Sequence, residues 1–394
     1  MRRVCAGFLT LVLLLTLLPA NGWAKEKKED SGPKLAKESA SAILMVADTG
    51  TVLYKKNADK ELPPASMTKI MTMLLIMEAL DSGKISLDEK VRASEHAASM
   101  GGSQIFLEEG ETMTVKQLLK AVAIGSANDA SVALAEYIAG SEEAFVKMMN
   151  RKAKELGLEH THFSNATGLP AKNHYSSAED MAVMARALLQ HEKITEYTGT
   201  YEEYLREGTD NKFWLVNTNR LVKFYPGVDG LKTGYTNEAK YCLTATAERH
   251  EMRVIAVVMG ASTPKDRNRQ VTKMLDYAFN QYRTHKIYDE GTVIGKVHVD
   301  KGVNNRMPVI TSRKVAVLTK KGESPKHIKK TIDLEENLKA PVKKGEQVGK
   351  VIVKKEGEIV TEVPLVAGEK VPEASWWQLF KRSLGNLTLQ SNDH

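Results

Sequence analysis

The chain is poor in cysteine and has only one long apolar run. Its 394 residues include two cysteines, Cys5 and Cys242, and Cys5 lies in an amino-terminal segment with the features of a secretory signal. Removal of that segment would leave Cys242 without a partner, so an internal disulfide is excluded even though export permits one. The sequence also lacks a cysteine cluster and the His-Glu-x-x-His string of zinc hydrolases. We therefore expect neither a metal nor a cofactor.

The first 24 residues predict a cleaved signal peptide. Arg2 and Arg3 precede an apolar stretch over residues 8–18, and Gly22-Trp23-Ala24 forms a small-x-small cleavage site. The stretch is short for a membrane span, although an uncleaved anchor is the alternative. Residues 25–37 are charged and lack apolar periodicity, which predicts a flexible leader.

Positive charge exceeds negative charge, with 56 Lys and Arg against 49 Asp and Glu. The formal net charge of +7 falls to +5 if Arg2 and Arg3 leave with the signal. A basic exported protein meets anionic wall polymers and anionic lipid head groups, although a solvated lysine-rich surface accounts for most of this charge. No basic stretch is interleaved with aromatic residues, so we do not expect nucleic acid as a partner.

Helical and extended patterns alternate over residues 38–283, which predicts an α+β domain. Strands are expected over 42–46, 52–54, 241–247 and 253–259, and helices over 66–82, 115–124, 130–138, 142–156, 178–190 and 265–283. Strands at both ends with helices between them favour one antiparallel sheet flanked by a helical cluster. Over residues 284–371, short β-prone runs alternate with Gly and Lys turns, which predicts a small all-β sandwich domain.

Residues 372–394 predict an amphipathic helix. Apolar side chains fall near one helical face, with Lys381 and Arg382 beside them: Trp376, Trp377, Leu379, Phe380, Leu384 and Leu387. Paired tryptophans with basic neighbours are typical of a helix that lies in a membrane interface. A helix that packs on the β domain is the alternative.

Three short strings follow one another along the chain: Ser66-Met67-Thr68-Lys69, Ser126-Ala127-Asn128 and Lys232-Thr233-Gly234. Each is weak alone, because Ser31-Gly32-Pro33-Lys34 also fits Ser-x-x-Lys. In this order, at intervals that fit one domain, they match the Ser-x-x-Lys, Ser-x-Asn, Lys-Thr-Gly set of penicillin-interacting serine enzymes.

The first string predicts a nucleophile and its base. A spacing of three on a helix puts Ser66 and Lys69 on one face. Lys69 can accept the Ser66 proton only if its amine is neutral, and burial and a second cation, for which Lys232 is the candidate, both lower a lysine pKa. At a helix N-terminus, free N–H groups near Ser66 can serve an oxyanion. The alternative is that Ser66 is an N-cap.

The other two strings supply small polar groups. In the break between two helices, the Ser126 hydroxyl can relay a proton to a leaving amine and Asn128 can hold a substrate amide; alternatively, both residues cap the next helix. Lys232-Thr233-Gly234 is expected to precede a strand. Lys232 and Thr233 offer donors to a carboxylate, and Gly234 allows close backbone approach, although the tripeptide alone would be an ordinary turn.

Together with further segments, these strings make residues 38–387 resemble the low-molecular-mass penicillin-binding proteins, the serine D-Ala-D-Ala carboxypeptidases. The further segments are residues 156–158, 162–169, 175–180, 226–231 and the region of Arg267. Residues 94–106 and 213–225 are similar to the DacF sporulation type of spore-forming Gram-positive bacteria. Ala127 stands where many relatives have Gly.

The resemblance implies a penicillin-binding/β-lactamase-like α+β transpeptidase fold, then a β-sandwich and an amphipathic membrane helix. It implies Ser66 as nucleophile, Lys69 as base, Ser126 as proton relay, Asn128 as a ligand of the substrate backbone, Lys232, Thr233, Gly234 and Arg267 at the substrate carboxylate, and the backbone N–H groups of Ser66 and Tyr235 as the oxyanion hole. It also implies removal of the terminal D-alanine from peptidoglycan pentapeptide stems, covalent inhibition by β-lactams, and a peripheral location on the outer face of the cytoplasmic membrane.

Three other functions are considered. A class A β-lactamase needs a Glu-x-x-Leu-Asn string, which residues 165–180 lack. A D,D-endopeptidase or transpeptidase stays open, because water or an amine can attack the same acyl-enzyme. A non-catalytic wall-binding protein would not need every one of the implied catalytic side chains.

Overall fold

The computed structural model describes residues 33–191, 193–323, 328–335 and 337–382. The predicted signal peptide, most of the predicted leader, and Leu384 and Leu387 of the predicted terminal helix lie outside these ranges. Within them, no helix combines the length and the apolar character needed to cross a membrane.

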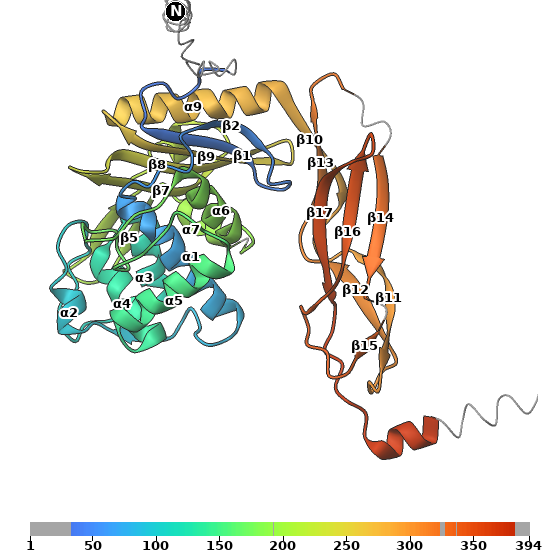
Figure 1. The fold of residues 1–394 in the computed structure, drawn as a ribbon. Coiled ribbons are helices and arrows are strands. Elements are labelled where there is room, and N and C mark those ends of the chain that lie inside the picture. The colour runs from blue at the N-terminus through green and yellow to red at the C-terminus, as the bar shows by residue number, and fades with distance from the viewer. Residues whose placement is uncertain (1–32, 192, 324–327, 336, 383–394) are drawn as a thin grey trace, which may run out of the picture. The chain divides into compact units, whose positions relative to one another are not determined.

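A five-stranded antiparallel sheet joins the two ends of the amino-terminal domain (Figure 1). Its order is β2-β1-β9-β8-β7, with β1 at Ser41–Val46, β2 at Val52–Lys56, β7 at Val228–Thr236, β8 at Lys240–Arg249 and β9 at Met252–Ala261. β1 pairs with β9 along its whole length, from Ser41 opposite Met259 to Val46 opposite Val254. The expected antiparallel sheet with flanking helices is confirmed.

Alternate side chains of the sheet enter two separate cores. Leu44, Val254 and Ala256 pack in the core of α9 (Pro264–Gln281), whereas Ile43 and Ile255 pack in the core of the helical cluster. Successive strand residues point to opposite faces, so strands that are apolar on both faces need a cover on both. Figure 1 shows α9 along one face of the sheet and α1 and α6 on the other.

Two of the predicted helices change their winding next to the polar strings. The helix expected over 66–82 starts as a 3₁₀ turn, η1 (Ala65–Thr68), and continues as α1 (Lys69–Asp81). The helix expected over 115–124 is α3 (Val115–Lys120) followed by a π-helical turn, η2 (Ala121–Gly125).

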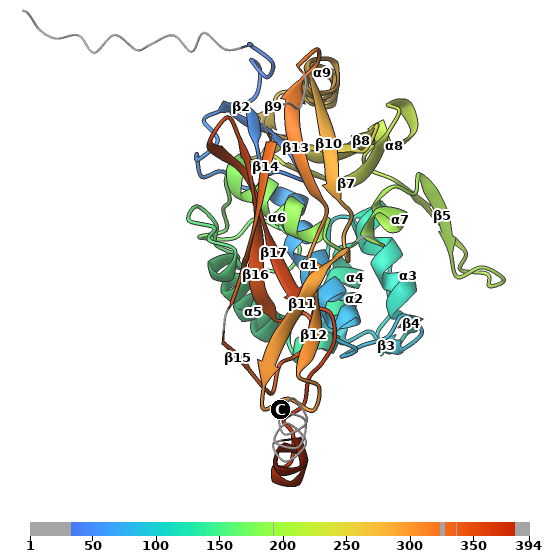
Figure 2. The ribbon, with the colours of Figure 1, turned by 90° about the vertical axis from the view of Figure 1, so that its right-hand side faces the viewer.

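The remaining helices are α2 (Glu95–Ala98), α4 (Asn128–Ala139), α5 (Glu142–Glu155), α6 (Ala178–Leu188), α7 (Ile194–Thr198) and α8 (Leu221–Phe224). Two short antiparallel pairs complete the domain: β3 (Lys90–Arg92) with β4 (Thr112–Thr114), and the hairpin of β5 (Glu202–Leu205) with β6 (Phe213–Val216). The β5–β6 hairpin, which the sequence did not predict, projects from the domain (Figure 2).

The second domain is all-β, as expected. β10 (Tyr282–Tyr288) pairs with β13 (Val315–Lys320). A six-stranded sheet has the order β14-β16-β17-β12-β11-β15, with strands Ile328–Leu334, Gln347–Lys355, Glu358–Ala367, Arg306–Thr311, Val293–Asp300 and Leu338–Lys339. Val315 and Val317 of β13 share one core with Val309, Val351 and Val363 of the larger sheet.

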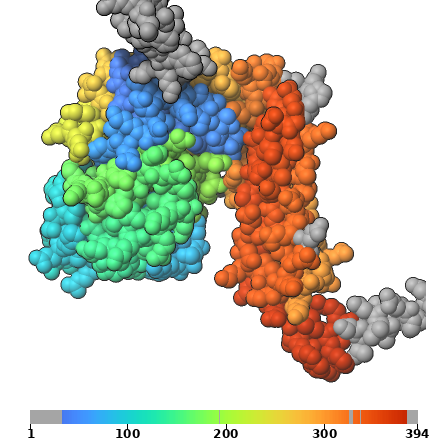
Figure 3. Space-filling view, viewed as in Figure 1, coloured from blue at the N-terminus to red at the C-terminus, as the bar shows by residue number. Residues whose placement is uncertain are grey.

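A short helix over residues 376–382 ends the described chain and forms the red lobe of Figure 3. Ser375 caps it, because its hydroxyl accepts from the Gln378 N–H. Its aromatic side chains are exposed, at 73% for Trp376, 54% for Trp377 and 41% for Phe380, and the three rings stack on one another. Arg382 donates to the carbonyls of Gly302 and Val303, so the helix touches the β domain through its polar side.

Candidate active site

The three polar strings meet at one cleft of about 710 Å³. Ser66 of η1, Ser126 of the α3–α4 connection, Thr233 and Gly234 of β7, and Arg267 of α9 all line it. The helical cluster, the edge strand β7 and the helix α9 thus each contribute one side.

Lys69 lies beneath Ser66 and has no exposed surface. Its Nζ is 3.2 Å from Ser66 Oγ, 2.6 Å from Asn128 Oδ1 and 2.7 Å from the carbonyl oxygen of Thr167. Ser66 belongs to the 3₁₀ turn η1, and Lys69 is the first residue of α1. The tighter winding of η1 places Ser66 above the Lys69 amine. Ser66 is not an N-cap: Pro64 precedes η1 and Thr68 precedes α1, and neither caps through its side chain.

Burial sets the electrostatics of the two lysines. Burial lowers the pKa of Lys69 well below its usual value, and the charge of Lys232 lowers it further. Lys232 is 1% exposed, and burial together with the Arg267 guanidinium lowers its pKa to about 7. The predicted pair of a buried lysine and a second cation is therefore present.

The Ser126–Asn128 string connects two helices without capping the second. The backbone of Ser126 is left-handed, at φ 64° and ψ 28°, where η2 ends. Ala127 is the N-cap of α4 and makes no side-chain cap bond, so the capping alternative is wrong. Instead, Asn128 accepts from Lys69 through Oδ1 and donates through Nδ2 to the carbonyl of Gly101, at 2.7 Å. The amide is thereby held with its oxygen towards the lysine.

The Lys232–Gly234 string lies inside β7, not in front of a strand as the sequence predicted. The sequence of β7 has a weak strand pattern, because it contains two glycines and glycine is disfavoured in strands. Gly234 has a packing reason: a Cβ there would lie 2.7 Å from the carbonyl oxygen of Pro64 and 3.1 Å from Ala65 Cβ. Only glycine lets β7 run this close to η1.

The side chains expected at a substrate carboxylate gather along β7. Thr233 Oγ1 donates to Thr218 Oγ1 at 2.8 Å, and both residues line the cleft. Arg267 is 7% exposed and donates to Asn268 Oδ1 through Nε and Nη2. Tyr235 follows at the outer end of the string, 51% exposed, and its ring stacks on that of Tyr241 at 4.4 Å.

Several groups at the site were not predicted from the sequence. Two are backbone carbonyls, those of Thr167 and Gly101, whose role leaves no side-chain signature in the sequence. Thr218 precedes α8 and had no motif to mark it. Asp129 directly follows the Ser-x-Asn string, and its buried carboxylate accepts from the N–H groups of Ile105 and Leu107. It thus holds the segment whose Gly101 carbonyl binds Asn128.

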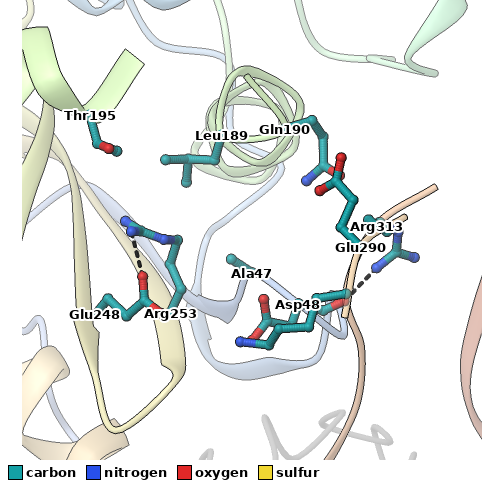
Figure 4. A pocket seen from close by; sticks show the side chains of 10 residues that line it. Ala47, Asp48, Leu189, Gln190, Thr195, Glu248, Arg253, Glu290 and Arg313 are labelled. Atoms are coloured by element: carbon teal, nitrogen blue, oxygen red, sulfur yellow. Dashed lines mark hydrogen bonds and ion pairs between the residues drawn. The ribbon is translucent and has the colours of Figure 1, made fainter. Parts of the chain in front are cut away.

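A smaller pocket, of about 280 Å³, contains none of the predicted site residues (Figure 4). Its charges pair among themselves: Arg253 with Glu248 at 2.6 Å and Lys314 with Asp48 at 2.9 Å, while Arg313 donates to the Asp48 carbonyl. Across the described ranges, no three His, Cys, Asp or Glu side chains gather in a way that could hold a metal ion.

Replacement of Gly234 by alanine should damage the cleft. The new Cβ would meet the Pro64 carbonyl, so η1 or β7 must move, at a cost of about 1–3 kcal/mol in the free energy of unfolding. A displacement on the order of 1 Å at Ser66 would lower labelling by a fluorescent penicillin about 10²-fold. Urea unfolding and labelling rates measure both effects. Gly295→Ala is the matched control, because its φ lies outside the left-handed region and nothing lies near its Cβ position. Wild-type labelling by Gly234→Ala would contradict the close approach.

Comparison with known proteins places this cleft in a family. A profile described as D-alanyl-D-alanine carboxypeptidase matches residues 26–263, and one described as the C-terminal domain of penicillin-binding protein 5 matches residues 282–373. The chain is 58% identical over 388 residues to D-alanyl-D-alanine carboxypeptidase DacF of Bacillus subtilis (strain 168), with 98% of this chain and 99% of the relative covered.

Comparison with solved structures also finds penicillin-binding proteins. Penicillin-binding protein 5 from Haemophilus influenzae is 31% identical, with a TM-score of 0.67, over 87% of this chain and 99% of that one. Penicillin-binding protein D2 from Listeria monocytogenes, solved in an ampicillin-bound form, is 34% identical, with a TM-score of 0.57, over 63% of this chain and 100% of that one. The chain therefore belongs to the family of serine D-alanyl-D-alanine carboxypeptidases.

Proposed function

We propose that this carboxypeptidase removes the terminal D-alanine from peptidoglycan pentapeptide stems through an acyl-enzyme on Ser66. The observation that carries the proposal is the contact between the Ser66 hydroxyl and the amine of a fully buried lysine, Lys69, at 3.2 Å. Removal of that D-alanine would limit cross-linking of the cell wall.

The hydrogen bonds of Lys69 explain how its amine can act as a base. A neutral amine has two N–H donors and one lone pair. The acceptors at 2.6 and 2.7 Å, Asn128 Oδ1 and the Thr167 carbonyl, take the two donors. The lone pair is then left for the hydroxyl proton of Ser66. Burial and the charge of Lys232 lower the pKa of Lys69 and so shift its amine towards this neutral form.

The reaction then runs in two halves. Ser66 Oγ attacks the carbonyl of the penultimate D-alanine as its proton passes to Lys69, and the backbone N–H groups of Ser66 and Tyr235 stabilise the oxyanion. Ser126, which lines the cleft with Ser66, relays a proton to the leaving amine, and D-alanine departs. Water next attacks the ester, the proton that it loses returns to Ser66, and the shortened stem leaves.

Substrate selection would depend on the carboxylate at the end of the stem. Thr233 and Arg267 line the cleft and offer a hydroxyl and a charged donor to it, and Lys232, buried next to Thr233, would add a second charge. Asn128 would hold the substrate backbone, which requires a further contact from an amide that already accepts from Lys69 and donates to the Gly101 carbonyl. A β-lactam carries a strained amide beside a carboxylate, so the same groups would bind it and Ser66 would be acylated.

The same acyl-enzyme could pass its acyl group to an amine, so a transpeptidase or endopeptidase remains the second candidate. Product analysis on a stem pentapeptide that ends in D-Ala-D-Ala decides between them. Release of free D-alanine with a tetrapeptide product supports the carboxypeptidase, whereas cross-linked products in the presence of an acceptor amine support transfer. If neither product forms and penicillin leaves no covalent adduct, the protein is a non-catalytic wall-binding protein.

Ser66 should carry the adduct after treatment with penicillin. Mass spectrometry of digested protein is expected to find the added mass on the peptide that contains Ser66 and none in Ser66→Ala.

Lys69→Arg should lose acylation by a factor of about 10²–10⁴, because arginine keeps the charge but cannot lose its proton to act as a base. An adduct that persists in Ser66→Ala, or near wild-type acylation of Lys69→Arg, would overturn these assignments.

The pH dependence of acylation should depend on Lys232. Its charge lowers the pKa of Lys69, so Lys232→Gln should raise that pKa and keep the base protonated to higher pH. The acid limb of the acylation rate is then expected to shift to higher pH, in addition to the lower rate that loss of a carboxylate partner causes. Lys265→Gln removes an exposed charge from the rim of the cleft and should leave the limb in place. If the acid limb of the acylation rate does not shift in Lys232→Gln, the pKa of Lys69 does not depend on the charge of Lys232.

We also propose that the exported enzyme is attached to the outer face of the cytoplasmic membrane through residues 372–394. Three exposed, mutually stacked aromatic rings form an apolar patch beside Lys381, whose Nζ lies 5.4 Å from the Trp377 ring centre. Aromatic rings with basic neighbours suit an interfacial helix. Each such basic residue adds about 1 kcal/mol of attraction to anionic lipid. Arg382 contributes less than the sequence suggested, because its guanidinium is occupied by Gly302 and Val303.

Removal of the helix should release the protein from lipid without loss of activity. A chain that ends at Ser375 keeps the bond from the Ala374 N–H to the Lys301 carbonyl, so the β domain stays intact. It should no longer co-sediment with anionic liposomes, while penicillin labelling stays at the full-length level because the cleft lies before residue 284. A full-length variant with Trp376, Trp377 and Phe380 changed to serine tests the aromatic rings alone, and it should behave like the truncated chain. Equal sedimentation of all three proteins would contradict the attachment.

A further inference from the structure

We propose that His174 is a positioning residue for Lys69. By binding both Thr68 and the backbone of Ser164, it would fix the segment that carries the Thr167 carbonyl, and this carbonyl orients the lysine amine towards Ser66. The inference rests on the proposed function of Ser66 and Lys69.

The hydrogen bonds of His174 define one tautomer. The Ser164 N–H donates to Nδ1 at 3.1 Å, so Nδ1 carries no proton. Nε2 must then carry it and donates to Thr68 Oγ1 at 2.8 Å. The ring is 7% exposed and meets the ring of Phe163 edge-on. Burial lowers the pKa of His174 to about 4, which favours this neutral tautomer at neutral pH.

Both partners of His174 belong to the base site. Thr68 stands between the nucleophile and the base in the Ser66–Lys69 string and is fully buried. Ser164 begins the segment over residues 164–174, whose Ala166 and Thr167 carbonyls accept from Thr72 Oγ1 and Lys69 Nζ, at 2.7 Å each. His174 is therefore a side-chain bridge between this segment and the turn that bears Ser66.

The bridge has little room to adjust. Gly168 follows Thr167 with φ +86°, and a Cβ on it would lie 1.9 Å from the Ala65 carbonyl oxygen and 2.9 Å from Thr68 Oγ1. The segment thus lies against η1 at backbone distance, as β7 does at Gly234. A shift of the segment would move the Thr167 carbonyl and leave Lys69 with one fixed acceptor, so its lone pair would no longer be directed at Ser66.

Substitutions of His174 test this role on the full-length enzyme. His174→Ala should lower the rate constant of acylation by a penicillin on the order of 10- to 100-fold, as expected for a small misplacement of a reacting group. Affinity of the non-covalent complex should change less than about twofold, because the carboxylate side of the cleft is untouched. His162→Ala is the matched control: the residue lies two positions before this segment, its ring is exposed and binds the Asn173 carbonyl, and the hydrogen bond to Thr68 comes from His174 instead. It should acylate like wild type.

Two conservative variants separate positioning from general stabilisation. The amide nitrogen of His174→Gln can replace Nε2 and reach Thr68, whereas the amide oxygen of His174→Asn can replace Nδ1 and reach only Ser164. Gln should restore more of the acylation rate than Asn. Thr68→Val should cost a similar factor to His174→Ala, and the double variant should cost little more than either alone, since both remove the same bond.

The possible outcomes lead to different conclusions. Folded His174→Ala that acylates at the wild-type rate, equal rescue by Gln and Asn, or additive losses in the double variant would each overturn the inference. If His174→Ala does not fold, the comparison of Gln with Asn decides. Acylation of wild-type Ser66 is measured in every series. Its absence would mean that the proposed function fails, whereas normal acylation of wild type and of all variants would reject only the role of His174.

Discussion

The burial of one amine determines the organisation of this active site. Lys69 has no exposed surface, and the hydrogen-bonding partners of its Nζ are neutral oxygens of Ser66, Asn128 and Thr167. A charged ammonium would be costly in such surroundings, so the environment favours the neutral form. The same burial that makes the residue costly for the fold lowers its pKa, as the proposed role of Lys69 as a base requires. The charge of Lys232 adds to this effect, and the Arg267 guanidinium in turn lowers the pKa of Lys232.

Two close backbone approaches hold the buried amine under Ser66. β7 comes within reach of η1 only because Gly234 has no side chain, and the segment over residues 164–174 does so because Gly168 has none. The turn that bears Ser66 is thus enclosed by two elements that are distant in the sequence. The sheet makes this possible, since β1 and β9 pair at its centre and bring the start and the end of the domain together.

Side-chain motifs were predictable from the sequence, and backbone contributions were not. The three strings identified Ser66, Lys69, Ser126 and Asn128, and the cleft does bring them together. The acceptor carbonyls of Thr167 and Gly101 could not be predicted, because any residue type offers a carbonyl. β7 was missed as a strand around Lys232-Thr233-Gly234, since its glycines serve close approach rather than strand propensity. A single histidine such as His174 has no motif, and its two bonds depend on contacts with residues up to 106 positions away.

The charge of Lys69 in the free enzyme is the most direct test of this account. Lysine labelled with ¹³C at the ε carbon can be titrated by NMR, with the Lys69 signal assigned by its loss in Lys69→Arg. A pKa far below the usual lysine value of 10.5 is expected for Lys69. A pKa for Lys69 close to 10.5 would mean that the buried amine is charged at neutral pH, and it would contradict the role of Lys69 as the base for Ser66.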